Sequence, residues 1–375
     1  MHTRAEYEVM LQALGVCICA RVPFLLWGDP GEGKTAVVES ARAHGWHVET
    51  LIISHHEPSD FAGLPVVVKG GVTLAPPLWA QRLAAHDGPS IAFFDEWTTA
   101  APAVQAAALR PLTHYQVGAL QLPATVSFGA AANHADIATA GWELAAPTAN
   151  RFCHFEWNMP LEVYAESLVT QQWPGIPLYA VPAAYDAGIA AARVQVAGFL
   201  RARGSQLKAI PGDADGRGRA FCTPRTWDYA ARLMALAVAV GAHEDAVRLL
   251  VSGTIGAATA HEFVTWIDQQ DLPDPEDLLA TENGRVFAKM RPDRVYVVLQ
   301  SLLAAVVAQP TPQRWAAAIR LCAAAAGFAG LDPAVPVVRA LVRDGVRPAG
   351  SQVPPEIKVF ATPLALAGLL QEPAA

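Results

Sequence analysis

The sequence predicts an α/β fold in which a parallel sheet with covering helices is followed by a region made of helices alone. A glycine-rich turn joins an apolar strand to a helix near residue 30. Further apolar strands follow up to about residue 157, and their ends carry polar residues. Beyond Pro160 only helical periodicity remains, interrupted by proline and glycine clusters. Such a pattern of apolar strands and helices is typical of a parallel sheet that is covered by helices.

The length and composition predict several folded parts. The chain has 375 residues, of which 53% are hydrophobic and 16% are charged, a balance that favours packed helices over disorder. A chain of this size exceeds one ordinary domain. We expect an α/β core over residues 1–160 with an insert at about 60–78, a linker and helical lid over 161–266, and a helical C-terminal extension over 267–375.

Charge and hydropathy disfavour several classes of protein. Counting 27 basic against 34 acidic residues gives a net charge of −7, and no run of Lys and Arg forms a stripe that could follow a nucleic-acid backbone. The most apolar runs are too short or too interrupted to span a membrane. The first residues lack the apolar segment of a signal peptide, and the five cysteines lie in apolar surroundings typical of reduced thiols. We therefore expect a cytoplasmic protein without membrane contact.

A phosphate-binding loop is predicted between the first strand and the helix that follows it. The stretch "GDPGEGKT" matches the pattern G-x-x-x-x-G-K-[ST], with the apolar "VPFLLW" before it and "TAVVESARAHG" after it. Glycines let backbone N–H groups surround a phosphate at a helix N-terminus. Lys34 is expected to reach the terminal phosphates and Thr35 to bind Mg²⁺. The predicted nucleotide-binding residues are Gly28, Asp29, Pro30, Gly31, Glu32, Gly33, Lys34 and Thr35.

An acidic pair after a later strand distinguishes hydrolysis from simple nucleotide binding. Ile91 to Phe94 predict a buried strand that ends in Asp95 and Glu96, which places two carboxylates beside the phosphates at the carboxyl edge of the sheet. Asp95 is expected to hold the Mg²⁺ shell, and Glu96 to orient and polarise the attacking water. A small-molecule kinase would not need that second carboxylate.

Three further polar residues are candidates for the same site. Asn133 follows the apolar stretch "ATVSFGAAA", where its amide could hold the attacking water without competing for the metal. Arg151 precedes another apolar strand, and Arg225 begins a long amphipathic helix. Taken singly, each arginine is better explained by a surface or capping role.

The order of these motifs resembles the AAA+ ATPases of the MoxR type, which include NorQ/CbbQ-like and gas-vesicle GvpN-like proteins. The resemblance covers roughly residues 5–265, and it includes "EPSDFAGLPV", "FFDEWTTAAPAVQAAAL", "AAANHAD", "NRF" and "TPRTW" in the family's order. It also includes "VVVKGGVTLAPPLW", whose two β-branched arms and glycine tip predict the β-hairpin that this family inserts into helix 2.

The resemblance implies roles, cofactors and partners. Lys34 and Thr35 match the Walker A positions, Asp95 and Glu96 the Walker B pair, and Asn133 sensor 1. Arg151 matches the arginine finger, which acts across a subunit boundary, and Arg225 matches sensor 2, for which the sequence leaves open whether it acts within or between subunits. The family implies ATP and Mg²⁺ as cofactors, a ring that is commonly a hexamer, and chaperone-like remodelling or maturation of a partner protein, which commonly carries a von Willebrand factor A domain.

Other functions remain open from the sequence. AAA+ cores also drive nucleic-acid-directed motors and restriction-type NTPases, against which the net charge argues. A nucleotide-dependent switch without turnover is a third reading, against which Glu96 argues. The pairs His55–His56 and His134–Asp136 raise a metal hypothesis, although neither has the spacing of a zinc site.

Overall fold

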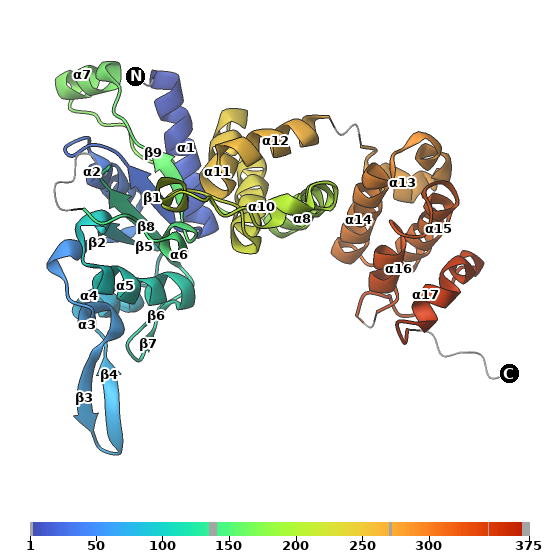
Figure 1. Ribbon diagram of the computed structural model, residues 1–375, viewed down its shortest axis with the longest axis horizontal. Coiled ribbons are helices and arrows are strands. Elements are labelled where there is room, and N and C mark those ends of the chain that lie inside the picture. Colours follow the sequence, from blue (N-terminus) through green and yellow to red (C-terminus); the bar gives the residue numbers. More distant parts are fainter. Residues whose placement is uncertain (1–2, 135–140, 270–271, 344, 370–375) are drawn as a thin grey trace. The chain divides into compact units, whose positions relative to one another are not determined.

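The computed structural model describes residues 3–134, 141–269, 272–343 and 345–369, and it contains two compact units (Figure 1). Unit 1 comprises Met1–Tyr185 and Gln206–Glu262, and unit 2 comprises Asp186–Ser205 and Phe263–Ala375. Each unit has a hydrophobic core of its own: two clusters of buried side chains flank the sheet of unit 1, and a third cluster fills unit 2.

Unit 1 is built on a five-stranded parallel sheet with the strand order β2-β5-β8-β1-β9. Its strands are β1 (Phe24–Trp27), β2 (His47–Ile52), β5 (Ser90–Asp95), β8 (Val126–Ala132) and β9 (Cys153–Glu156). Every residue of β1 and β8 is buried, as expected for parallel strands covered by helices on both faces. Because the strands are parallel, all of their carboxyl ends lie along one edge of the sheet.

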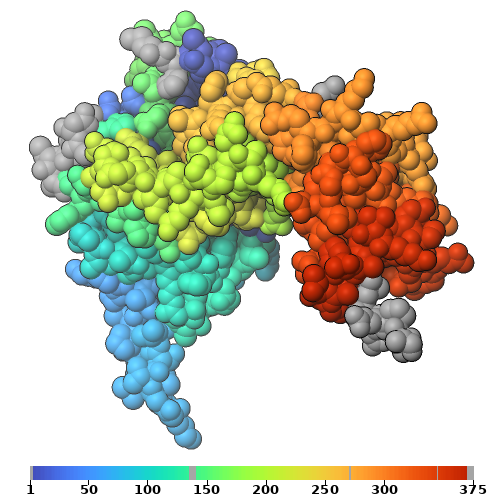
Figure 2. Space-filling model, turned by 45° about the vertical axis from the view of Figure 1, so that its right-hand side comes forward, coloured from blue at the N-terminus to red at the C-terminus, as the bar shows by residue number. Residues whose placement is uncertain are grey.

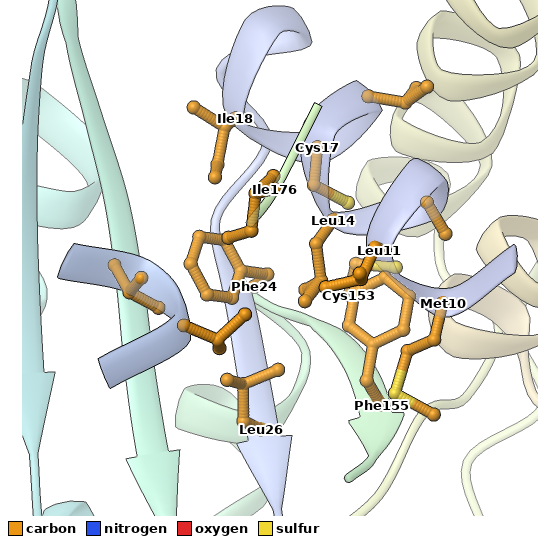
Figure 3. Close-up of a cluster of buried hydrophobic side chains, with 14 of the residues drawn as sticks. Met10, Leu11, Leu14, Cys17, Ile18, Phe24, Leu26, Cys153, Phe155 and Ile176 are labelled. Carbon is orange, nitrogen blue, oxygen red and sulfur yellow. The ribbon is translucent and has the colours of Figure 1, made fainter. Parts of the chain in front are cut away.

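Alternate side chains of β1 pack into different clusters on the two faces of the sheet. Phe24 and Leu26 belong to the first cluster, in which α1 contributes Met10, Leu11 and Leu14 (Figure 3). Leu25 and Trp27 belong to the second, to which α4 and α5 contribute. The helices of the sheet region are α1 (Arg4–Ala20), α2 (Lys34–Glu39), α3 (Ser59–Ala62), α4 (Leu78–Ala85), α5 (Pro102–His114) and α6 (Ala146–Ala149).

A β-hairpin stands between the second and third strands of the sheet, where the sequence predicts the helix-2 insert. Strands β3 (Leu64–Val68) and β4 (Gly71–Ala75) are antiparallel neighbours, and a tip at Lys69 and Gly70 connects them. The hairpin projects from the body of unit 1 (Figure 2), and Val67 and Val72 are 83% and 68% exposed. A second, shorter hairpin joins β6 (Gln116–Val117) to β7 (Leu120–Gln121).

The rest of unit 1 is helical, and the residues at the start of its helix α10 are ones that favour the beginning of a helix. Thr223 caps α10 by accepting from the backbone N–H of Thr226, and Pro224 occupies the first helical position. The helices after β9 are α7 (Leu161–Thr170), α8 (Tyr185–Ala202), α9 (Ala214–Arg217), α10 (Pro224–Ala239), α11 (Glu244–Ile255) and α12 (Ala257–Asp268). Residues 186–205 of α8 and the turn after it, and the end of α12 from Phe263, belong to unit 2.

Unit 2 is a helical bundle around the buried side chains of Trp315, Leu299 and Leu302. Its remaining helices are α13 (Pro275–Thr281), α14 (Pro292–Ala308), α15 (Pro312–Ala329), α16 (Val335–Leu341) and α17 (Ala361–Ala365). Two bidentate ion pairs, Arg314–Glu276 and Arg320–Glu282, join α15 to α13 and to the residue that follows α13. The predicted fold class is confirmed as an α/β fold, in which a parallel sheet with covering helices carries an inserted β-hairpin and is followed by helical regions. Within the described residues, none of the helices has the length and apolar character needed to cross a membrane.

A buried histidine in β9 predicts a pH dependence of stability. The Nδ1 of His154 accepts from the indole N–H of Trp27 at 2.9 Å, and its Nε2 donates to the carbonyl of Ala149 at 2.9 Å, so the neutral ring is fully hydrogen-bonded. Burial lowers the pKa of His154 from 6.5 to about 4. A histidine whose pKa is lower in the folded state stabilises the fold above its unfolded pKa. That contribution is lost as the pH falls from about 6.5 towards 4, and it amounts to about 3 kcal/mol at most.

The substitution His154→Gln keeps an acceptor for Trp27 but does not titrate. Urea unfolding between pH 4 and 7 should therefore show a shallower loss of unfolding free energy for the variant than for the wild type. Parallel curves for the two proteins would contradict this assignment.

Candidate functional site

The loop between β1 and α2 has the backbone that phosphate binding requires. Gly31 and Gly33 have φ angles of +84° and +78°, which side chains other than glycine rarely adopt. A Cβ on Gly28 would lie 2.5 Å from the carbonyl oxygen of Trp157. The indole of Trp157 donates to the carbonyl of Glu32 at 2.9 Å, so the segment after β9 also holds the loop. The sequence therefore needs glycine at these positions for the loop to close in this form.

Lys34 lies at the centre of a network that joins two strand ends. Its Nζ donates to the carbonyls of Gly28 and Asp29, both at 2.8 Å, and to Oδ1 of Asn133 at 3.0 Å. Burial lowers the pKa of Lys34, although the nearby carboxylates, of which Asp95 is the strongest, oppose this shift. The structure thus brings the predicted phosphate lysine and the predicted sensor asparagine into direct contact.

Thr35 and Asp95 are also in contact. The hydroxyl of Thr35 donates to Oδ2 of Asp95 at 2.5 Å, and Oδ1 of Asp95 accepts from the backbone N–H of Glu96 at 2.8 Å. Hydroxyl and carboxylate oxygens are the ligands that Mg²⁺ prefers, usually together with water and substrate phosphates. These two donors, side by side at the loop, fit the predicted metal position.

Glu96 has a constrained backbone and a hydrogen-bonded carboxylate. Its φ of 57° lies in the left-handed region, which costs a non-glycine residue roughly 1–2 kcal/mol. Its Oε2 accepts from the hydroxyl of Ser54 at 2.8 Å. Ser54 follows β2, whose last residue Ile52 pairs with Asp95 in the register of β2 with β5. That bond occupies one oxygen of the carboxylate that is predicted to polarise water.

Removal of the Ser54 hydroxyl should raise basal turnover. In Ser54→Ala the Glu96 carboxylate loses one hydrogen bond and accepts more readily from a water molecule, so any hydrolytic turnover that depends on Glu96 should rise roughly threefold to tenfold, the equivalent of about one hydrogen bond. The matched control is Thr50→Val, in the strand β2 that precedes Ser54, which removes a hydroxyl that donates to the carboxylate of Glu39. A steady-state rate assay measures both, and an unchanged or lower rate in Ser54→Ala would contradict the restraining role.

A cavity of about 610 Å³ opens beside the loop. Its lining includes Gly31, Gly33 and Val37, together with the aromatic residues Tyr7, Tyr164 and Trp173. Aromatic and aliphatic walls next to a phosphate loop suit a flat heterocyclic base. The sequence did not single out this aromatic set, because it comes from α1, α7 and the segment after α7.

Arg151 and Arg225 lie together, at the opposite edge of the sheet from Lys34. Both line a cavity of about 730 Å³ with Pro23, which precedes β1, and Ala124, which precedes β8. These neighbours mark the amino ends of the strands, whereas Lys34 follows the carboxyl end of β1. Strands of four to seven residues separate the two edges by roughly 13–23 Å. The structure therefore does not bring either arginine to the phosphate loop of its own chain.

The cavity with Arg151 and Arg225 concentrates positive charge. Arg21 and Arg232 also line it, and the lining that the structure describes includes no aspartate or glutamate. Burial and then repulsion from Arg225 lower the pKa of Arg151, and Nε of Arg151 has no hydrogen-bond partner among the residues that the structure describes. A group of cations in such surroundings is stabilised by an anion.

Two residues that contact or adjoin the predicted site residues escaped the sequence prediction. The residues around Ser54 do not mark it as a site residue, because its contact with Glu96 depends on the register between β2 and β5. Arg219 stands in the stretch "IPGDADGRGRAF", which the sequence marks only as a loop, yet its guanidinium lies in a pocket with Asn133. For the metal hypothesis, Asp136 lies outside the described residues, and within them no group of three or more His, Cys, Asp or Glu residues could hold a metal ion.

Comparisons with known proteins add little to this picture. No family model matches the chain. No curated protein matches it either. Among solved structures it is similar to a crystal structure of a "putative ATPase" from Cytophaga hutchinsonii, with 14% sequence identity and a TM-score of 0.40 over 70% of this chain and 88% of that chain.

Proposed function

We propose that this protein is an ATP hydrolase. The observation that carries the proposal is the convergence of three strand ends on the phosphate loop, which places Lys34 against Asn133 and Thr35 against Asp95. The glycine-rich loop would hold the phosphates, and the aromatic cavity beside it would hold the base. Glu96, next to Asp95, would polarise the attacking water, and Asn133 would orient it.

Thr35 and Asp95 would hold Mg²⁺ in this scheme. The metal would neutralise charge on the phosphate oxygens. Lys34 would exchange its present bonds with the loop carbonyls for bonds to phosphate oxygens, since an ammonium group prefers an anion to a neutral carbonyl.

We further propose that the site is completed by a second copy of the chain. Arg151 and Arg225 share one cationic cavity at the far edge of the sheet, too distant to serve their own phosphate loop but available to the loop of a neighbouring subunit. Such an interface joins two different surfaces, and repetition of it closes a ring. The resemblance to MoxR-type proteins favours a hexamer, and it assigns Arg151 as the arginine finger and Arg225 as sensor 2.

A protein partner is the proposed target of the hydrolysis cycle. The β3–β4 hairpin exposes valines on a projecting element, which suits contact with another protein. It is joined to the site through α3 and the turn that carries Ser54, so movement of the hairpin would reach Glu96. The resemblance suggests chaperone-like remodelling or maturation, with a partner that carries a von Willebrand factor A domain.

The test of hydrolysis is the substitution Lys34→Ala. Purified protein should release phosphate from ATP in a Mg²⁺-dependent manner, and the variant should lose about 100-fold or more of that rate, because it loses the cation at the transferred phosphate. The matched control is Lys289→Ala, an exposed lysine in unit 2. Equal rates in wild type and Lys34→Ala would show that the activity does not come from this site.

A further inference from the structure

The guanidinium of Arg219 joins three side chains beside the phosphate loop. It lies over the ring of Trp27 at 3.9 Å from the centroid, Nη1 donates to Oε1 of Glu156 at 2.8 Å, and Nη2 donates to Nδ1 of His134 at 3.2 Å. Since Nδ1 of His134 accepts, its proton is on Nε2, which faces Oε2 of Glu156 at 3.4 Å. The guanidinium group thus stacks on one ring and uses both of its terminal nitrogens in hydrogen bonds.

The three contacted residues stand at the carboxyl ends of adjacent strands. Trp27 ends β1 and pairs with Ala132 of β8 on one side and with Glu156 of β9 on the other. His134 lies two residues after Ala132. Arg219 therefore bridges the ends of three strands at the edge where the phosphate loop begins.

Two of the residues that Arg219 contacts are the sequence neighbours of residues that accept hydrogen bonds from Lys34. Trp27 precedes Gly28, whose carbonyl accepts from Nζ of Lys34. His134 follows Asn133, whose amide oxygen also accepts from Nζ. In addition, Trp27, Asn133 and Arg219 line one pocket of about 250 Å³. Each of these two groups is thus one peptide unit away from a residue that Arg219 contacts.

We propose that Arg219 is a positioning residue for Asn133 in the hydrolytic reaction. It holds His134, the residue next to Asn133, and thereby keeps the amide of Asn133 against Lys34. Small displacements of such preorganised groups reduce a rate strongly while they change the affinity for the substrate less. The inference rests on the proposed ATP hydrolysis, and it assigns a role within one subunit, separate from the role between subunits proposed for Arg225.

A plain surface ion pair would not have this effect. Exposed pairs contribute little, and the carboxylate of Glu156 is 60% exposed. The stacking on Trp27 and the second bond to His134 distinguish Arg219 from such a pair, because both depend on the planar, forked guanidinium group. Lysine at this position could keep the pair with Glu156 but not the stacked, two-armed geometry.

The experiment compares Arg219→Ala, Asn133→Ala and the double variant by turnover at saturating ATP and by affinity for a fluorescent ATP analogue. Arg219→Ala should lower turnover about tenfold or more while the affinity changes less than about threefold, and Arg219→Lys should recover only part of the rate. The control is Arg217→Ala, on the same segment, where the Nε of Arg217 donates to the backbone carbonyl of Asp213. This control should keep wild-type turnover.

The double variant tests whether Arg219 acts through Asn133. If Arg219 acts through Asn133, the double variant should be no slower than Asn133→Ala alone, because the residue to be positioned is already gone. Losses that multiply, or unchanged turnover in Arg219→Ala, would overturn the inference while leaving ATP hydrolysis in place. If Lys34→Ala hydrolyses ATP as fast as the wild type, the proposed function fails, and this inference falls with it.

Discussion

The variant Glu96→Gln should still bind ATP, but it should lose almost all of its ATP hydrolysis. The amide oxygen of glutamine still accepts from the hydroxyl of Ser54, so the side chain keeps its place, but it no longer polarises water. Removal of a general base typically costs about 10²- to 10⁴-fold in rate. The groups around the phosphates, Lys34, Thr35 and the loop backbone, are unchanged, so the affinity for ATP should stay close to that of the wild type.

The measurement is phosphate release together with equilibrium binding of a fluorescent ATP analogue. The matched control is Glu57→Gln, an exposed glutamate three residues after Ser54, which should turn over like the wild type. Hydrolysis by Glu96→Gln at more than about a tenth of the wild-type rate would remove Glu96 from the role of base. Normal assembly and partner response in such an inactive variant would favour a nucleotide switch instead.

The sequence predicts the parts of this site whose geometry is local. The phosphate loop is a single turn between consecutive elements, and its glycines and Lys34 carry the pattern within eight residues. Asp95 and Asn133 are predictable for a related reason. Each follows a strongly apolar strand, and parallel strands bring their carboxyl ends to one edge without any knowledge of the strand order. The hairpin tip and the cap at Thr223 likewise depend only on neighbouring residues.

Contacts that depend on the register or on the path of a long segment lie beyond such reasoning. Ser54 contacts Glu96 because β2 pairs with β5 with Ile52 opposite Asp95, and a shift by one residue would remove the contact. Arg219 belongs to a glycine-rich stretch whose route over Trp27 no periodicity encodes. Similarly, the packing of α8 with unit 2 depends on tertiary contacts between residues far apart in the sequence.

The placement of the two arginines has the most direct experimental consequence. Arg151 and Arg225 line the same cavity at the amino edge, and a tie between their segments holds them there. Asn150, next to Arg151, donates to the carbonyl of Phe221 at 3.2 Å and accepts from the hydroxyl of Thr223 at 2.8 Å. The two arginines should therefore serve the same nucleotide, in a neighbouring subunit.

Two inactive variants should consequently regain activity when they are mixed. Arg151→Ala retains its own phosphate loop, and Lys34→Ala retains its own Arg151. Where the phosphate loop of an Arg151→Ala subunit faces the Arg151 of a Lys34→Ala subunit, the interface has every required group. In randomly mixed rings, about a quarter of the interfaces should be complete, so turnover should recover to roughly that fraction of the wild type. No recovery in demonstrably mixed oligomers would show that Arg151 does not act between subunits.

Mixing Arg151→Ala with Arg225→Ala then determines which nucleotide Arg225 serves. If both arginines reach the same neighbouring nucleotide, each kind of subunit offers only one of them, no interface is complete, and the mixture should stay inactive. If Arg225 instead serves its own nucleotide, a subunit with Arg151→Ala keeps Arg225 and receives Arg151 from its neighbour. About a quarter of the activity would then return. The shared cavity and the tie through Asn150 predict the inactive mixture.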